Sequence, residues 1–127
     1  MNTHSTRLSL VLKGTLAAAA LALSSSVASA AGDAAAGAAI FKSKCVVCHK
    51  ADASGGVHFG ATESADLRAP ELEKQYKETD ALLMRAMLDG KDEDGQDLAK
   101  IMPRWRGKLT DADAANVIAF LKTEMKN

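Results

Sequence analysis

The amino-acid sequence predicts a single all-α domain of three to five helices. Several segments carry apolar residues at helical spacing and begin behind residues that favour a helix N-terminus. No segment shows the alternating apolar and polar pattern of a half-buried strand. The chain has 127 residues without an internal repeat or a linker, a length that suits one small domain.

Residues 1–30 have the features of a cleaved secretory signal peptide. Arg7 and Lys13 give a positively charged start, an apolar stretch follows, and Ala28-Ser29-Ala30 matches the A-x-A cleavage pattern. The alternative is a membrane anchor, but the apolar stretch is well short of the ~20 residues that a spanning helix needs. We therefore expect export, no stable membrane insertion after cleavage, and a mature domain comprising residues 31–127.

The charge of the mature domain argues against nucleic-acid binding. The whole chain has 16 basic and 16 acidic residues. Removing Arg7 and Lys13 leaves 14 basic residues against 16 acidic ones, so the mature domain carries a net charge of −2. A nucleic-acid-binding protein needs a basic face, so we expect no nucleic-acid partner. We also expect the protein to be a monomer. Large side chains are also few, which favours a bulky apolar cofactor in the core.

The first predicted helix begins at Asp33, a good N-cap residue, and runs to about Cys48. Gly37 lies inside it, four residues before Phe41 and on the same face. Glycine inside a helix costs roughly 1 kcal/mol relative to alanine, so we expect another segment to approach this helix closely at Gly37. From residue 50 to residue 69 the chain is predicted to be a loop, interrupted by three glycines.

Three further helices are predicted in the second half of the chain. A short one follows Pro70, because proline suits a first helical turn. The next begins at Thr79 and ends at Gly90, which favours the C-terminal cap. The last begins at Thr110, with Asp113 making a weak capping box. Its buried face is predicted to consist of Ala114, Val117, Ile118 and Leu121.

The segment Cys45-Val46-Val47-Cys48-His49 is the C-x-x-C-H signature of haem c attachment. Two cysteines three residues apart on a helical turn face the same way, so each sulfur can add to one vinyl group of the porphyrin. The next residue then lies beneath the ring, where its imidazole reaches the iron. We predict one covalent haem c, attached through Cys45 and Cys48, with His49 as an iron ligand.

Three other roles are open to the same two cysteines. A disulfide between Cys45 and Cys48 suits an oxidising compartment. A thioredoxin-like redox pair belongs beside a βαβ pattern, which the sequence lacks. A zinc site needs a second pair of cysteine or histidine ligands, and the sequence offers none. The export signal and the helical pattern favour haem over these three roles.

Met102 is the predicted second ligand of the iron. It lies in a loop before the last helix, and Pro103 fixes the backbone that follows it. The alternative ligand is His58, the one other histidine of the mature domain. The remaining methionines lie in a leucine-rich helix or near the chain end: Met84, Met87 and Met125.

The chain resembles the class I c-type cytochromes, the small soluble monohaem electron carriers of bacteria, over nearly all of residues 33–125. The resemblance rests on the early C-x-x-C-H motif, on Ile101-Met102-Pro103 and on the terminal helix around Phe120. In that family the N-terminal helix crosses the C-terminal helix at a glycine and aromatic side chains, and Gly37, Phe41 and Phe120 match them. The resemblance implies a single domain with the cytochrome c fold, its terminal helices crossing, around one haem.

The resemblance also implies a hydrogen bond that orients the iron-ligating histidine. In the family, a proline followed shortly by leucine supplies the carbonyl that accepts from the histidine Nδ1–H. Pro70 with Leu72 matches that pattern, so we expect the Pro70 carbonyl to accept from His49. Trp105 is expected either to donate its indole N–H to a haem propionate or to pack on the ring edge.

Two ligands leave no open position on the iron, which predicts a periplasmic one-electron carrier and not an enzyme. The alternatives are a five-coordinate haem enzyme or gas-binding protein, and a dedicated electron-transfer subunit of a periplasmic oxidoreductase. The expected partners are redox proteins with an acidic docking face, because basic residues flank both haem contacts. These basic residues are Lys42, Lys44, Lys50, Arg104, Arg106 and Lys108.

Overall fold

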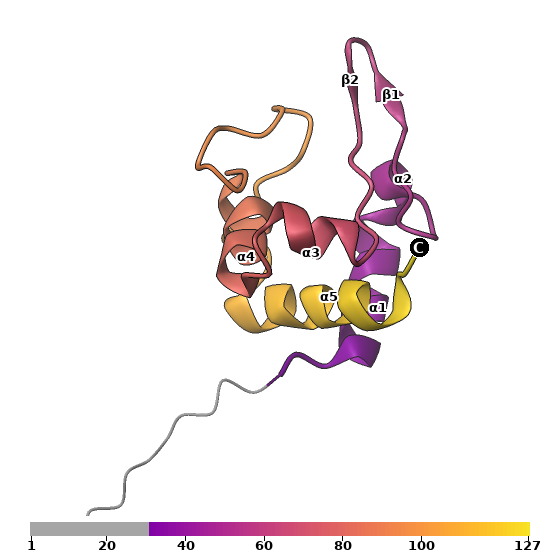
Figure 1. Ribbon diagram of the computed structural model, residues 1–127, viewed down its shortest axis with the longest axis vertical. Coiled ribbons are helices and arrows are strands. Elements are labelled where there is room, and N and C mark those ends of the chain that lie inside the picture. The colour runs from indigo at the N-terminus through magenta and orange to yellow at the C-terminus, as the bar shows by residue number, and fades with distance from the viewer. Residues whose placement is uncertain (1–30) are drawn as a thin grey trace, which may run out of the picture.

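A computed structural model describes residues 31–127 (Figure 1). The predicted signal peptide, residues 1–30, lies outside the described part of the chain and stays a prediction. No helix within residues 31–127 is long and apolar enough to cross a membrane. The five helices of this part are α1 (Ala34–Lys44), α2 (Val46–His49), α3 (Glu71–Gln75), α4 (Asp80–Asp89) and α5 (Asp111–Glu124). The predicted all-α class is confirmed.

The N-terminal segment forms two helices where one was predicted. Asp33 caps α1 as expected, since its Oδ1 accepts from the Ala35 N–H at 2.9 Å and from the Ala36 N–H at 3.2 Å. The helix then ends at Lys44, because Cys45 has a φ of −114°, well away from the helical value near −63°. One more helical turn, α2, follows and carries the rest of the C-x-x-C-H motif.

The predicted crossing of the terminal helices is confirmed (Figure 1). Gly37 lies where α1 meets the backbone of α5. A Cβ atom at Gly37 would lie 1.9 Å from the Asn116 carbonyl oxygen, so only glycine lets α1 and α5 approach this closely. The Asp33 N–H also donates to Asn116 Oδ1 at 2.7 Å. Beyond the crossing, the Phe41 and Phe120 rings pack with centroids 5.3 Å apart and planes inclined at 48°.

Helix α5 is fixed at its start by the predicted capping box. Thr110 Oγ1 accepts from the Asp113 N–H at 3.0 Å, and the Asp113 carboxylate accepts from the Thr110 N–H at 2.9 Å. The buried face of α5 packs against α1 and α4. This face contains the four predicted residues and one more, Phe120: Ala114, Val117, Ile118, Phe120 and Leu121.

Two connections project in the same direction from the helices (Figure 1). One is a short hairpin in which β1 (His58–Phe59) pairs antiparallel with β2 (Thr62–Glu63). No strand was predicted there, because strands of two residues are too short to show an alternating pattern. The other is the loop that follows α4. Gly90, with a φ of 67°, caps the C-terminus of α4 as predicted.

Candidate functional site

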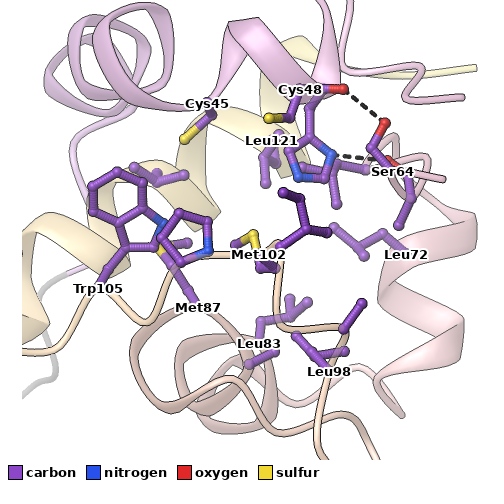
Figure 2. A pocket seen from close by; sticks show the side chains of 18 of the residues that line it. Cys45, Cys48, Ser64, Leu72, Leu83, Met87, Leu98, Met102, Trp105 and Leu121 are labelled. Carbon is purple, nitrogen blue, oxygen red and sulfur yellow. Dashed lines mark hydrogen bonds between the residues drawn. The ribbon is translucent and has the colours of Figure 1, made fainter. Parts of the chain in front are cut away.

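A cavity of about 300 Å³ lies among the helices and is bounded by both projecting connections (Figure 2). The four predicted site residues, Cys45, Cys48, His49 and Met102, all line it. Most of its wall is apolar, and its buried apolar side chains come from α1, α3, α4 and α5 and from the residue that follows α3. These residues are Phe41, Leu72, Tyr76, Leu83, Ala86, Val117, Ile118 and Leu121. A large apolar group fits such a wall in a domain with few bulky side chains of its own.

Cys45 and Cys48 are separate thiols on this wall, and they are not joined by a disulfide. Burial raises the pKa of the Cys45 thiol to about 11, with a smaller contribution from Cys48 and an opposing one from Lys44. A thioredoxin-like pair needs an activated thiolate, which a pKa near 11 does not provide. Within residues 31–127, no three side chains of metal-binding type gather as a zinc site requires.

His49 is buried and already oriented by the protein. Its Nδ1 lies 2.9 Å from the Ala65 carbonyl oxygen. A carbonyl oxygen only accepts, so Nδ1 carries the proton and Nε2 is left with a free lone pair for a metal. Burial lowers the pKa of His49, and the bond to Ala65 offsets this in part. The imidazole is therefore neutral at pH 7, as an iron ligand must be.

The prediction that Pro70 supplies this carbonyl is wrong. The Pro70 carbonyl accepts from the Lys74 N–H at 3.0 Å, as part of the first turn of α3. Ala65 supplies the bond to His49 instead. Ala65 stands two residues before Leu67, the same spacing to leucine as the expected proline, and Leu67 also lines the cavity. The prediction chose Pro70 because it is a proline, whereas the carbonyl that bonds to His49 belongs to an alanine at the same spacing from a leucine.

Gly55 and Ser64, which were not predicted to belong to the site, connect the Ala65 loop to the C-x-x-C-H motif. A Cβ atom at Gly55 would lie 2.2 Å from the Ala65 oxygen, and Gly55 donates its N–H to the His49 carbonyl at 3.1 Å. The Ser64 hydroxyl donates to the Cys48 carbonyl at 2.7 Å (Figure 2). Two hydrogen bonds thus tie the loop to the C-x-x-C-H motif near the contact between Ala65 and His49.

Met102 reaches the cavity from the loop between α4 and α5. Figure 2 shows its sulfur near the middle of the cavity, with Cys45 and Cys48 to one side of it. Its N–H donates to the Ala99 carbonyl at 3.0 Å, which turns the chain at this point. Pro103 follows it on the cavity wall. The structure thus brings a thioether and the His49 imidazole to one cavity, and their ligation of iron stays a prediction.

The alternative ligand, His58, does not line the cavity. It lies in β1, its side chain is 77% exposed, and its Nδ1 is 3.7 Å from Glu63 on the paired strand. His58 is therefore a surface histidine.

Met87, in contrast, lines the cavity from helix α4.

Trp105 lies on the cavity wall between two lysines. The Lys44 Nζ is 5.9 Å from the centre of the indole ring and the Lys108 Nζ is 5.7 Å from it. Two arginines expected beside them at a docking face are instead engaged by the protein itself. Arg106 pairs with Asp89 and, at 3.5 Å, with Asp111. Arg104 bonds to backbone carbonyls.

A helical domain that presents two thiols, a neutral buried imidazole and a thioether to one apolar cavity belongs to the class of haem c proteins. A family model for cytochrome c matches residues 34–124, and the chain belongs to the cytochrome c family. No curated protein gives a significant match. As a member of this family, the protein binds one covalently attached haem c, for which Cys45 and Cys48 have the required spacing, and carries electrons.

Proposed function

We propose that this cytochrome c is a periplasmic one-electron carrier whose haem iron is ligated by His49 and Met102. The observation that carries the proposal is that both side chains line one apolar cavity from separate parts of the chain. One is a nitrogen ligand whose tautomer is fixed by Ala65, and the other is a thioether on a loop tied to α4. With both positions taken, oxygen or peroxide has no place to bind.

The residues of the chain have separate parts in this function. When bound, the haem supplies an iron that gains and loses one electron. Cys45 and Cys48 would hold it covalently, and His49 would ligate through Nε2 because the bond to Ala65 keeps the proton on Nδ1. A thioether at Met102 favours the ferrous state. The apolar wall acts in the same direction by excluding water, since burial disfavours the more highly charged ferric state.

The docking face that this structure supports is smaller than the sequence suggested. Lys44 and Lys108 flank Trp105 at the cavity, and Ile101, which also lines it, is 51% exposed. We propose that a redox partner contacts this apolar edge with acidic residues opposite the two lysines. Arg106 adds little to that field because Asp89 and Asp111 neutralise it.

The experiment that tests the proposal exposes the reduced holoprotein to carbon monoxide. We expect the wild-type spectrum to stay unchanged, because Met102 closes the sixth position, and the Met102→Ala variant to bind carbon monoxide readily. His58→Ala is the matched control and should behave as the wild type does. Rapid binding by the wild type would contradict the proposal and favour a five-coordinate enzyme or gas-binding protein.

A further inference from the structure

We infer that Arg104 is the positioning residue for Met102: its guanidinium gathers the backbone of the loop so that the thioether stays directed into the cavity. The inference rests on the proposed ligation of iron by Met102. It assigns to Arg104 a role inside the protein in place of the docking role suggested by its charge. The inference is supported by four hydrogen bonds from Arg104 to the loop and by the close contact between Arg104 and Gly90.

The Arg104 guanidinium donates to four backbone carbonyls of one loop. Nη1 donates to the Met102 carbonyl at 2.7 Å and to the Ala99 carbonyl at 3.1 Å. Nη2 donates to the Leu98 carbonyl at 2.8 Å and, at 3.4 Å, to the Gly90 carbonyl. The loop from the end of α4 to Met102 is thereby folded around one planar cation.

The carbonyls of Leu98 and Met102 depend on this side chain. Among the backbone bonds of residues 31–127, no N–H donates to either carbonyl, whereas those of Gly90 and Ala99 also accept from the backbone. Arginine suits the task because its rigid fork presents five N–H donors in one plane. A lysine ammonium is a point charge with three donors on a flexible stem, and it cannot span all four carbonyls.

Gly90 provides the surface on which the guanidinium rests. A Cβ atom at Gly90 would lie 2.2 Å from Arg104 Nε and 2.4 Å from Cζ. Gly90 is thus required for its positive φ of 67°, which caps α4, and also for the space that Arg104 occupies. The same end of α4 receives the Trp105 N–H at the Met87 carbonyl, 3.2 Å away. Met102 therefore lies in a loop anchored to α4 on both sides.

Two neighbouring residues serve as matched controls. Arg106 is two positions further on, carries the same charge and bonds to Asp89 and Asp111 without touching the loop carbonyls. Gly95 lies in the same loop with a positive φ of 84°, and a Cβ atom there would meet nothing within 4 Å. Substitutions at Arg106 and Gly95 reproduce the change of charge and the backbone strain without disturbing the Arg104 contacts.

The test measures how fast added imidazole displaces Met102 from the ferric holoprotein, followed by loss of the sulfur-to-iron charge-transfer band. Imidazole is largely neutral above its pKa, and it can enter only when the loop lets the thioether leave. We expect Arg104→Gln to accelerate displacement about tenfold or more, because charged hydrogen bonds are the stronger ones. Arg104→Lys should recover only part of the loss, and Arg106→Gln should match the wild type. Displacement from Arg104→Gln at the wild-type rate would overturn the inference.

A second pair of variants reaches the same contact without altering Arg104. We expect Gly90→Ala to accelerate displacement as Arg104→Gln does, because the new methyl group expels the guanidinium, and Gly95→Ala to leave the rate unchanged. Adding Gly90→Ala to Arg104→Gln should produce little further acceleration, since both changes remove the same interaction. Equal rates for Gly90→Ala and Gly95→Ala would contradict the inference.

The failure of this inference and the failure of the proposed ligation give different results. If the wild-type ferric protein lacks the sulfur-to-iron band, Met102 is not the ligand and both proposals fall. If the band is present and Arg104→Gln behaves as Arg106→Gln does, the ligation stands and only the role of Arg104 is refuted.

Discussion

The imidazole of His49 and the backbone carbonyl of Ala65 are joined by a hydrogen bond of 2.9 Å between residues 16 positions apart. The bond fixes which ring nitrogen is free for a metal, and it makes the imidazole a more electron-rich ligand. A more electron-rich ligand stabilises ferric iron and lowers the reduction potential. We therefore expect the position of this one backbone carbonyl to tune the reduction potential of the haem iron.

Gly55 is the residue through which this tuning can be tested. A methyl group at Gly55 would lie 2.2 Å from the Ala65 oxygen and would push it away from His49. If the bond stabilises the ferric state over the ferrous state by ~1 kcal/mol, its loss in Gly55→Ala should raise the reduction potential by about 40 mV in an equilibrium redox titration. Gly56→Ala is the control, since it has a similar φ of 72° and no atom closer than 3.8 Å. Equal potentials for the two variants would refute the role of the Ala65 carbonyl.

Gly37 gives a prediction in which two effects have opposite signs. Helix propensity alone predicts that Gly37→Ala stabilises α1 by roughly 1 kcal/mol. However, the added Cβ atom would lie 1.9 Å from the Asn116 carbonyl oxygen, and this clash would force the terminal helices apart. We expect the contact to dominate and the free energy of unfolding of the holoprotein to fall by about 3 kcal/mol in urea. Increased stability would show that the helices tolerate the methyl group.

The capping box predicts how stability depends on pH. The Thr110 backbone N–H, followed by its hydroxyl, holds the pKa of Asp113 below its ordinary value of 3.8. The ionised carboxylate is thus favoured by folding, and its contribution is present above pH 3.8 and lost as the pH falls through the lower folded-state pKa. We expect Asp113→Asn to reduce stability at pH 7 and to flatten the loss of stability below pH 4, measured by urea unfolding. Asp111→Asn removes a carboxylate from the same turn without touching the box, and an identical pH profile in both variants would contradict this account.

The docking face predicts a dependence of rate on salt. The second-order rate of electron transfer to an acidic partner should fall as ionic strength rises. Reversing Lys44 and Lys108 to glutamate should slow the reaction about tenfold at low salt with little change of potential. Lys77→Glu is the control for charge, because Lys77 pairs with Asp94 and does not line the cavity. A rate that is indifferent to salt and to both reversals would mean that apolar contact alone governs docking.

Local signals predicted the parts of this fold that depend on neighbouring residues. Asp33 and Thr110 start their helices as expected because a cap needs only the next few N–H groups. The C-x-x-C-H motif is local in the same way, and its three functional side chains reach one cavity. Gly37 was predicted to mark a close approach because an interior glycine is costly unless something requires it.

Contacts between distant segments explain what the sequence did not reveal. Ala65 bonds to His49 because Gly55 lets the loop cross the motif closely, and no local pattern records that path. The charge of Arg104 suggested a docking residue, although the carbonyls it binds belong to a loop that turns back on itself. The identity of a side chain indicates what it can bind, whereas the course of the backbone decides which partner it meets.

X-ray absorption at the iron of the ferric holoprotein tests the central claim most directly, because it identifies the atoms bound to the metal. The proposed ligation by His49 and Met102 predicts one sulfur atom among the iron ligands of the wild type and of His58→Ala. It predicts no sulfur ligand in Met102→Ala. A wild-type iron without a sulfur ligand, or a sulfur ligand that persists in Met102→Ala, would contradict the account.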